Sequence, residues 1–313
     1  MTAHRHTMIP RFARFGLAVL LACASSLFLG AKAADAPRQG PKNAEFIGSY
    51  RWSLPDPAFG GYSGLELGQD GRSFVALSDR GTILRGTLMR NDAGAVIGVA
   101  PGPIFTLHDS RANPLNRTNF DAEGLALLPD GRVAISFEGL HRVAVYDALD
   151  GPAGRLTRPK AFRSLISNGA LEALGVDAAG TLYTLPEQVR TTDEARPIWR
   201  FQNGVWDQPF TLPFAGDWQP VGMDFGPDGR MYLLERGFTF PLWFRARVRS
   251  FIVTPTGLQD ARVLLETRGG RHDNLEGLAV WQDSRGALRL TMISDDNFQF
   301  FQRTEWVDYK LVP

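Results

Sequence analysis

Acidic side chains recur at two fixed places in a repeated pattern of this chain, just before and just after a pair of short apolar runs. The acids that precede the first run are Glu123, Glu172 and Glu276. Those that follow the second run are Asp79, Glu138, Glu187, Glu235 and Asp295. If these two sets meet, they form a concentrated group of carboxylates. Like charges raise each other's pKa and repel, so such a group needs a cation.

The sequence offers two kinds of cation for these acids. Arg80 and Arg236 directly follow an acid, and a hard metal such as Ca²⁺ binds about six to eight oxygen ligands. We predict metal ligands at Glu66, Asp79, Glu123, Glu172, Glu235, Glu276 and Asp295. We predict catalytic roles for Glu138, Glu187, Arg80 and Arg236. The alternative is that each acid only braces its own part of the fold by accepting backbone hydrogen bonds.

The elements that must position these residues are β-hairpins. Two apolar runs separated by a tight turn such as Asp130-Gly131 are typical of a hairpin, and the pattern occurs five times. Its equivalent positions are residues 64, 124, 173, 222 and 277, which are 60, 49, 49 and 55 residues apart. A strand-rich repeat of about 40 to 60 residues predicts an all-β fold, a β-propeller with one blade per copy. Five blades are predicted, with six as the alternative because the 60-residue step could contain a degenerate copy.

The remaining strands follow from alternating patterns between the hairpins. They are predicted at 83–89, 96–107, 142–146, 155–165, 198–202, 205–212, 244–254 and 258–266. Segments 45–52 and 305–312 also alternate but belong to no repeat, so we expect the two chain ends to pair and close the ring. Segments 109–120 and 190–197 are polar and rich in turn residues, and we predict loops there. No helix is predicted after the N-terminal segment.

Composition narrows the possible functions. The net charge of +1 and the lack of a basic run argue against nucleic acid as a partner, and we expect a monomer. The sequence has no Gly-x-Ser-x-Gly elbow and no phosphate-binding glycine loop. Asp70, Asp130 and Asp228 precede glycines in the hairpin turns, so we interpret them as structural turn residues.

The first 33 residues resemble a secretory signal peptide. Arg11 and Arg14 precede an apolar run from 15 to 30, and Ala31-Lys32-Ala33 forms a cleavage site. We predict a signal peptide at 1–33, a flexible leader at 34–43 and the propeller domain at 44–313. The mature chain would then be periplasmic or secreted and would have no contact with a membrane. A membrane anchor at the same segment and a lipoprotein attached through Cys23 are the alternatives.

Cys23 is the only cysteine, and it lies inside this N-terminal segment. A mature chain that begins after residue 33 therefore has no thiol. This excludes disulfides, cysteine nucleophiles and thiolate metal sites.

The repeated runs resemble one family closely enough to name it. Ser63-Gly64-Leu65-Glu66, Asp121-Ala122-Glu123-Gly124-Leu125, Pro220-Val221-Gly222-Met223 and Asn274-Leu275-Glu276-Gly277-Leu278, with the acids that follow each hairpin, are similar to the phytase-like, or "esterase-like activity of phytase", family. The resemblance covers about 44 to 313. It implies an exported bacterial β-propeller and hydrolysis of phosphate or other esters. It does not identify metal ligands residue by residue.

Two functions from different classes are compatible with these residues. The first is a metal-assisted hydrolase of a small phosphate ester or other ester, in which bound Ca²⁺ offsets the charge of the acids. The second is a non-catalytic periplasmic propeller that binds a ligand or metal, or serves as a scaffold. Both require the acids to meet at one mouth of the central channel.

Overall fold

The computed structural model describes residues 43–116, 119–166, 169–189, 195–239 and 243–312. The predicted signal peptide and residues 34–42 of the predicted leader lie outside these ranges. No helix in the described part of the chain has the length and hydrophobicity needed to span a membrane. The domain organisation predicted at the N-terminus therefore stays a prediction.

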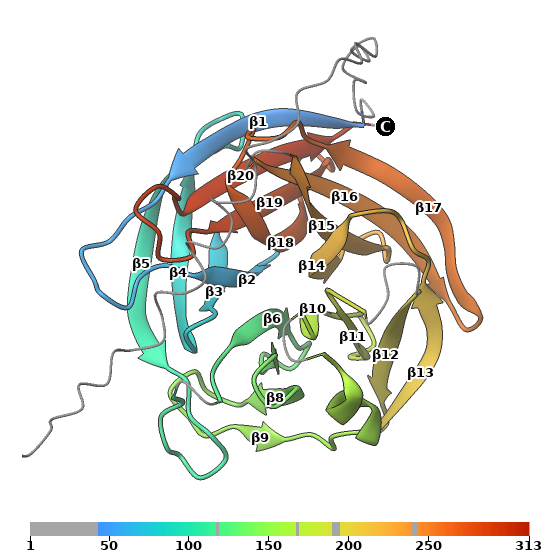
Figure 1. Cartoon of the computed structure of the whole chain (residues 1–313). Coiled ribbons are helices and arrows are strands. Elements are labelled where there is room, and N and C mark those ends of the chain that lie inside the picture. The colour runs from blue at the N-terminus through green and yellow to red at the C-terminus, as the bar shows by residue number, and fades with distance from the viewer. Residues whose placement is uncertain (1–42, 117–118, 167–168, 190–194, 240–242, 313) are drawn as a thin grey trace, which may run out of the picture. The chain divides into compact units, whose positions relative to one another are not determined.

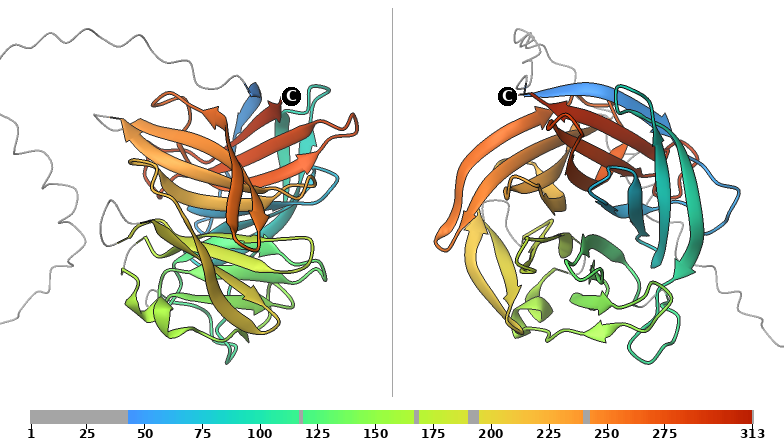
Figure 2. Two further views of the ribbon diagram at one scale, coloured as in Figure 1. Left: turned by 90° about the vertical axis from the view of Figure 1, so that its right-hand side faces the viewer. Right: turned by 180° about the vertical axis from the view of Figure 1, so that it is seen from behind.

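The described residues form five four-stranded antiparallel sheets around a common axis, a five-bladed β-propeller (Figures 1 and 2). Blade 1 consists of β2 (Tyr62–Leu67), β3 (Ser73–Ser78), β4 (Thr82–Arg90) and β5 (Val96–Thr106). Blade 2 consists of β6 (Ala122–Leu127), β7 (Val133–Phe137), β8 (Arg142–Tyr146) and β9 (Gly154–Arg155). Blade 3 consists of β10 (Leu171–Val176), β11 (Leu182–Pro186), β12 (Arg196–Gln202) and β13 (Val205–Leu212).

Blade 4 consists of β14 (Gln219–Phe225), β15 (Met231–Thr239), β16 (Trp243–Thr254) and β17 (Gly257–Glu266). Blade 5 consists of β18 (Asn274–Gln282), β19 (Leu288–Asp295), β20 (Glu305–Leu311) and β1 (Ala44–Arg51). The prediction of five blades is confirmed. The six-blade alternative is wrong, because the 60-residue first step is filled by the long strands β4 and β5 and by the segment 107–121.

The two ends of the described chain close the ring, as predicted. β1 pairs with β20 in antiparallel register, from Ala44 opposite Leu311 to Arg51 opposite Glu305. The N-terminal strand is therefore the outermost strand of blade 5 (Figure 1). This pairing gives blade 5 four strands, as in the other blades. It also joins the two ends of the described chain by main-chain hydrogen bonds.

The turn residues of the inner hairpins behave as predicted. Asp70, Asp130 and Asp228 each accept a backbone N–H two residues further on, at 2.9, 3.1 and 3.2 Å respectively. The following glycines have positive φ, for example 86° at Gly131. These aspartates therefore stabilise turns, and their carboxylates are not part of the acidic group.

The apolar core lies between the blades. Five clusters of buried side chains each combine residues of two neighbouring blades, so every blade packs on both sides. Leu77 of blade 1 packs with Ile135 of blade 2 in one cluster, and Leu234 of blade 4 packs with Met292 of blade 5 in another. Burial of apolar surface between sheets is the main favourable term in folding. The blades consequently hold one another in the ring.

Glycines let the innermost strands approach one another around the axis. A Cβ on Gly222 of β14 would lie 2.4 Å from the backbone oxygen of Glu276 in β18. A Cβ on Gly124 of β6 would lie 2.6 Å from the backbone oxygen of Glu172 in β10. Glycine at these positions is therefore required by close approach of neighbouring backbones. It brings Glu172 and Glu276 close to the axis.

Blade 2 departs from the prediction. A strand was predicted over 155–165, but β9 covers only Gly154–Arg155, and a short 3₁₀ helix, η2 (Lys160–Ser164), follows. The stretch contains Pro159, which has no N–H for a strand ladder. Phe162 of η2 is fully buried against Leu171 and Trp199 of blade 3. The chain therefore turns into the 3₁₀ helix, which buries the ring of Phe162, and the fourth strand of blade 2 ends at Arg155.

Candidate functional site

Every inner hairpin has a β-bulge at the start of its first strand, and the bulge presents the first set of candidate residues. The register shifts between Tyr62 and Gly64, Ala122 and Leu125, Leu171 and Ala173, Pro220 and Gly222, and Leu275 and Gly277. The unpaired residues inside these shifts include Ser63, Glu123, Glu172, Val221 and Glu276, which we call the inner ring. A bulge redirects a side chain without ending the strand. Three of the five inner-ring residues are the predicted glutamates.

A second ring lies at the ends of the neighbouring strands. The partners of Tyr62, Ala122, Leu171, Pro220 and Leu275 are followed in sequence by Asp79, Glu138, Glu187, Arg236 and Asp295, which we call the outer ring. A hairpin brings the start of its first strand next to the end of its second. The two rings therefore surround the same mouth of the central channel, as the sequence predicted for most of these acids.

The mouth carries much more negative than positive charge. Its carboxylates are Asp79, Asp121, Glu123, Glu138, Glu172, Glu187, Glu276 and Asp295, and all but Asp79 and Asp121 are buried. Arg236 is the one arginine among the ring residues, and Arg80 lies beside Asp79, so eight acids and two arginines give the mouth a formal charge of −6. Glu123 and Glu172 receive no hydrogen bond on their carboxylates from the described residues. This arrangement is stable only if protons or a further cation offset the charge.

Burial and mutual repulsion raise the pKa values of these groups. Burial, followed by the charges of Glu172 and Glu276, raises the pKa of Glu123 well above its usual range. Burial also raises the pKa of Glu138 to about 7 and that of Asp79 to about 6. Burial dominates these shifts, even at Asp79, where the neighbouring charge of Arg80 acts in the opposite direction. A divalent ion at the mouth would reverse them and would release protons on binding.

Arg236 links two of the predicted residues across blades 3, 4 and 5. Its Nη2 donates to Glu187, and its Nη1 donates to Glu276 Oε1 at 2.5 Å. Asn274 also donates from Nδ2 to Glu276 Oε1, at 2.8 Å. Burial raises the pKa of Glu276 to about 7 in spite of the opposing effect of Arg236. Arg236 therefore fixes the positions of two carboxylates and neutralises part of their charge.

Among the described residues, Asp121, Glu123 and Glu138 of blade 2 form a group of acids that lie close enough together to hold one metal ion. One carboxylate oxygen from each lies within 4.8 Å of the corresponding oxygens of the other two. Oxygen atoms from three carboxylates are the donor set that Ca²⁺ and other hard divalent ions prefer. The three residues thus fit a metal of this class by ligand type and by spacing.

The backbone positions these three acids. Asp121 has φ of 56°, a left-handed conformation that few residues other than glycine adopt. Its carbonyl accepts the N–H of Glu138 at 2.9 Å, and Glu138 Oε1 accepts the N–H groups of Gly169 and Ala170, the latter at 2.7 Å. Strained backbone persists where the surroundings determine it, often at functional sites. Glu138 is thereby held between blade 2 and the segment that leads into blade 3.

Asp121 is a site residue that the prediction missed. Sequence reasoning chose the acid nearest to each strand, and Asp121 lies two residues before Glu123. The Asp-x-Glu spacing was the available signal. It was not decisive because the left-handed turn that brings both carboxylates together is not visible in the sequence.

The prediction that Glu235 lies with the mouth acids is wrong. In the register of β14 and β15, Glu235 is opposite Pro220, and Arg236 follows it in the outer ring. Since side chains alternate along a strand, this one-residue difference turns Glu235 to the other face. There Glu235 accepts hydrogen bonds from Arg247 Nε at 2.7 Å and from Arg249 Nη2 at 2.5 Å.

Glu66 is not a ligand at this mouth either. It lies three residues beyond Ser63 along β2 and interacts electrostatically with Asp224, the equivalent residue of β14. Burial, then Asp224, raises the pKa of Glu66 well above its usual range, and burial raises that of Asp224 to about 7. Asp224 Oδ2 also accepts the N–H of Val280 at 2.6 Å. Glu66 and Asp224 thus lie close to each other, further along the channel than the mouth acids. We interpret both as residues that brace neighbouring strands.

Arg80 points to an aromatic ring. Its guanidinium carbon lies 3.0 Å from the ring centroid of Phe298 in the segment between β19 and β20. No ion pair within the described ranges involves Arg80. Its role toward a substrate stays a prediction, and the ring contact places it on the blade 1 and blade 5 side of the mouth.

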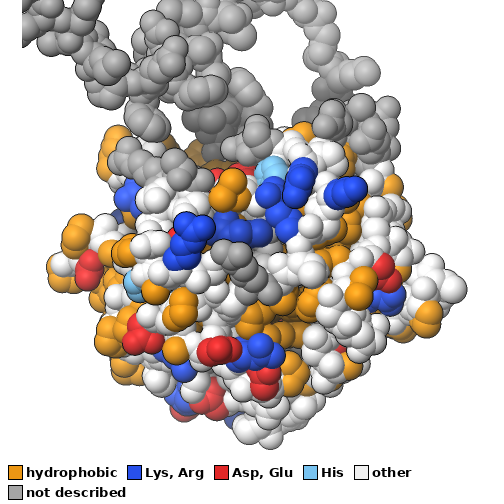
Figure 3. All heavy atoms as spheres, turned by 90° about the horizontal axis from the view of Figure 1, so that it is seen from below, with side chains coloured by type: hydrophobic (Ala, Val, Ile, Leu, Met, Phe, Trp, Pro, Cys, Tyr) orange, Lys and Arg blue, Asp and Glu red, His pale blue; other side chains and the backbone are white. Residues whose placement is uncertain are grey.

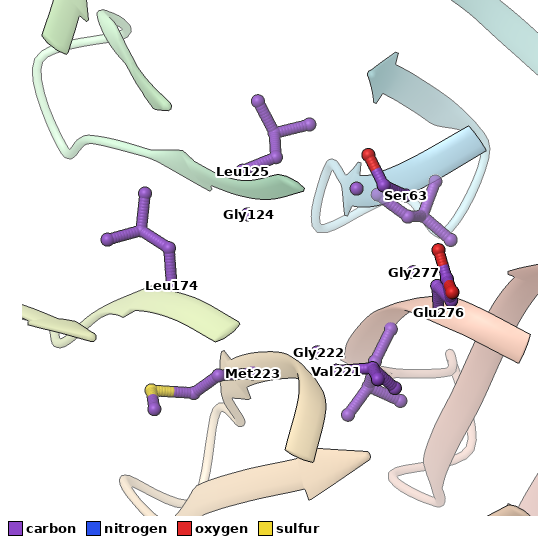
Figure 4. Close-up of a pocket in the computed structure, with 12 residues that line it drawn as sticks. Ser63, Gly124, Leu125, Leu174, Val221, Gly222, Met223, Glu276 and Gly277 are labelled. Carbon is purple, nitrogen blue, oxygen red and sulfur yellow. The ribbon is translucent and has the colours of Figure 1, made fainter. Parts of the chain in front are cut away.

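The channel below the mouth is too narrow for a substrate. Its cavity has a volume of about 10 Å³ and is lined by inner-strand residues of all five blades, among them Ser63, Gly124, Leu174, Val221 and Glu276 (Figure 4). That volume is about the room for one water molecule. Ser63 Oγ donates to the carbonyl of Ala122 at 2.7 Å, which further joins the inner strands. Any organic ligand of the acids therefore binds at the mouth.

Comparison with known proteins gives one family match. The family model for phytase-like proteins, described as "esterase-like activity of phytase", matches residues 57–298. No curated protein matches the chain.

Several solved structures are similar to this one at low sequence identity. An α-L-arabinofuranosidase from Podospora anserina gives a TM-score of 0.48 at 10% identity, with 82% of this chain and 93% of that chain covered. A PQQ-bound aldose sugar dehydrogenase from Streptomyces coelicolor gives 0.45 at 10%, with 88% and 100% covered. A gluconolactonase from Xanthomonas campestris gives 0.44 at 16%, with 81% and 77% covered.

Proposed function

This chain belongs to the phytase-like family, and on that premise we propose that it is a metal-assisted hydrolase of phosphate esters or other esters. The observation that carries the proposal is the group formed by Asp121, Glu123 and Glu138, whose carboxylate oxygens lie within 4.8 Å of one another at the mouth. These donors suit a hard divalent cation such as Ca²⁺. Such an ion, when bound, supplies Lewis-acid polarisation of an ester oxygen and lowers the pKa of a water molecule.

The other acids of the mouth have distinct tasks in this proposal. Burial, then the charge of Glu187, raises the pKa of Glu172 well above its usual range, and we therefore assign Glu172 the role of proton donor. A protonated carboxyl group at the mouth is suited to donate that proton to a leaving alkoxide. Arg236 holds Glu187 and Glu276 by hydrogen bonds, so we assign these two acids to positioning rather than to proton transfer.

The proposal includes export of the chain before it acts. Its support is the N-terminal pattern of Arg11 and Arg14, an apolar run and Ala31-Lys32-Ala33. Fractionation of cells that express the full chain, with mass determination of the mature N-terminus, tests this part. A mature chain that begins at Ala34 is the expected result, and a cytosolic chain that retains residues 1–33 would contradict it.

A turnover assay tests the hydrolase. Purified protein is mixed with Ca²⁺ and a chromogenic phosphate ester or carboxylate ester. We expect turnover that EDTA abolishes and that Glu123→Gln with Glu138→Gln lowers by roughly 100-fold, the scale of losing electrostatic stabilisation at a reacting centre. Glu45→Gln, at an exposed position of β1, is the matched control and should retain full activity. Turnover that is the same in the double variant and the wild type would rule out these acids as the reacting centre.

The same samples show whether a metal binds. A ligand that binds only the folded state adds about 2.7 kcal/mol of stability at 100 times its Kd. Ca²⁺ should therefore raise the melting temperature of the wild type and of Glu45→Gln, but not that of the double variant. Binding without turnover would favour the second function, a propeller that holds a ligand or metal without catalysis.

A further inference from the structure

The outer edge of β8 in blade 2 is only partly covered by a fourth strand. Its fourth strand, β9, pairs with β8 only through Ala144 opposite Arg155 and Val145 opposite Gly154. The first part of β8, Arg142 and Val143, therefore has no partner in a fourth strand. In the other blades the third strand is covered over most of its length, for example from Thr82 to Arg90 in blade 1.

A cleft lies beside this part of β8, where a longer fourth strand would otherwise pair. It has a volume of about 370 Å³, and Leu140, Val143 and Leu156 contribute apolar side chains to its lining. Pockets that bind small organic ligands usually have volumes of about 300 to 1,000 Å³. Figure 3 shows the molecule from below the view of Figure 1, where blade 2 lies, and on this face a group of Lys and Arg side chains gathers beside hydrophobic ones.

Three arginines line the cleft: Arg111, Arg142 and Arg158. No ion pair in the described part of the chain involves any of them. Arg90 and Arg249, two other arginines with buried side chains, each bind a carboxylate. The cleft thus gathers positive charge without the acids that accompany it elsewhere.

Arg142 is built into the wall of the cleft. Its Nη1 donates to the carbonyl of Gly139 at 2.5 Å and its Nη2 to that of Asn119 at 2.7 Å. Its guanidinium carbon lies 3.8 Å from the ring centroid of Phe137. Burial lowers the pKa of Arg142 to about 10, and the nearby positive charge of Arg158 acts in the same direction. These contacts fix a cation that the protein does not neutralise with an acid.

Asp109 is the one acid among the described residues that line the cleft. Its Oδ1 accepts the N–H of Arg111 at 2.8 Å and that of Asn113 at 2.9 Å. Its role is therefore to hold its own loop. Three arginines and one aspartate leave the lining with a formal charge of +2.

We propose that this cleft is a binding site for a small organic anion, a phosphate or carboxylate group carried on an apolar body. Arginine donates planar pairs of hydrogen bonds that match both anions, and the apolar lining accepts the rest of the ligand. The site does not use the acids of the mouth. Binding therefore does not require the metal or the reaction proposed above.

Calorimetry with four probes tests the proposal on the purified protein in EDTA. Phenylphosphonate and benzoate carry an anion on an aromatic ring, inorganic phosphate lacks the ring, and benzyl alcohol lacks the charge. We expect at least one of the two aromatic anions to bind at least tenfold more tightly than inorganic phosphate and benzyl alcohol. The preferred aromatic anion distinguishes a phosphate ligand from a carboxylate ligand. Equal binding of benzyl alcohol and the aromatic anions would overturn the proposal, as would no binding of either anion.

Substitutions of the cleft arginines test whether the aromatic anion binds in the cleft. Arg111→Gln with Arg158→Gln removes two exposed cations of the cleft and leaves Arg142 in place. It should weaken binding of the preferred anion at least tenfold. Arg72→Gln with Arg285→Gln, two exposed arginines of hairpin turns, changes the net charge equally and should keep the affinity within twofold. Glu123→Gln should also keep it. An affinity that is unchanged in the cleft variant, or equally reduced in the turn variant, would overturn the site.

Discussion

At the scale of single residues, the environment of each acid decides its role. Glu123 lies among other acids, Glu187 binds Arg236, and Glu235 is enclosed by Arg247 and Arg249. Glu123 lies in β6, Glu187 directly follows β11 and Glu235 lies in β15, and all three belong to the same hairpin pattern of the sequence. The bulge at the start of each hairpin and the register after it separate the acids of the mouth from those that brace a blade.

Glu66 and Asp224 show the cost of burying like charges away from a cation. Burial raises the pKa of Asp224 to about 7, whereas an unfolded aspartate titrates near about 4. The folded protein therefore holds a proton that the unfolded chain releases between these two pH values. By linkage, the stability associated with this proton is fully present below the unfolded pKa and is lost as the pH rises to about 7.

Asp224→Asn should therefore make stability less dependent on pH. We expect the free energy of unfolding of the wild type to fall more between pH 5 and pH 8 than that of the variant, because asparagine does not titrate. The upper limit of the effect is about 1.4 kcal/mol for each unit of pKa shift. Urea denaturation at both pH values in EDTA measures it, with Glu45→Gln as an exposed control. The same pH dependence in Asp224→Asn and the wild type would contradict the buried pair.

At the scale of the elements, glycine in the first strand sets how closely the blades meet. Gly64, Gly124, Gly222 and Gly277 occupy the same place in four hairpins, and Ala173 occupies it in blade 3. Each of the four glycines has a neighbouring strand within 3 Å of the position of a Cβ atom. The position of the inner-ring acids depends on this approach, because the next residue before each glycine belongs to that ring.

Gly222→Ala tests this dependence. Its Cβ would overlap the backbone oxygen of Glu276, so we expect a loss of about 2 to 3 kcal/mol in the free energy of unfolding, typical of overpacking. Displacement of Glu276 should also change any Ca²⁺ affinity of the mouth. Gly204→Ala is the control, since φ of 80° makes alanine strained there but no atom lies within 4 Å. It should cost about 1 kcal/mol and leave Ca²⁺ affinity unchanged. Equal losses in both variants would argue against close approach as the reason for the glycine.

At the scale of the whole propeller, closure of the ring depends on the boundary between blades 5 and 1. Besides the β1–β20 ladder, Arg90 of blade 1 binds Asp308 of blade 5 at 2.8 Å, and both side chains are 4% exposed. Asp308 Oδ2 also accepts the N–H of Val96 at 2.8 Å, and Thr291 donates to its Oδ1 at 2.7 Å. This buried network joins the last blade to the first.

Asp308→Asn should therefore destabilise the propeller strongly. Loss of the carboxylate leaves Arg90 buried without its counter-charge, which typically costs about 3 to 5 kcal/mol. Asp207→Asn removes the partner of Arg200 in an ion pair whose side chains are 25% and 50% exposed, and it should cost about 1 kcal/mol or less. Urea denaturation of both variants measures the difference. Similar small losses in the two variants would show that the network does not contribute to ring closure.

The sequence alone determined the architecture of this protein. Apolar alternation, Asp-Gly turns and a repeat of 49 to 60 residues are local signals, and each copy builds its hairpin from its own residues. They predicted five blades, a ring closed by the two chain ends and most members of the acidic mouth. These predictions needed only the knowledge that hairpin ends lie side by side.

Tertiary structure alone decided which acids meet and where the fold is open. Arg236 rather than Glu235 joins the outer ring because the register of β14 and β15 places Glu235 opposite Pro220, and consecutive side chains of a strand point to opposite faces. Asp121 joins Glu123 and Glu138 through a left-handed backbone conformation. The fourth strand of blade 2 is short beside the cleft because Phe162 is buried against blade 3 in a 3₁₀ helix, in a segment that the sequence predicted as a strand. Register, backbone conformation and packing between blades depend on contacts far apart in the chain, and no local pattern encodes them.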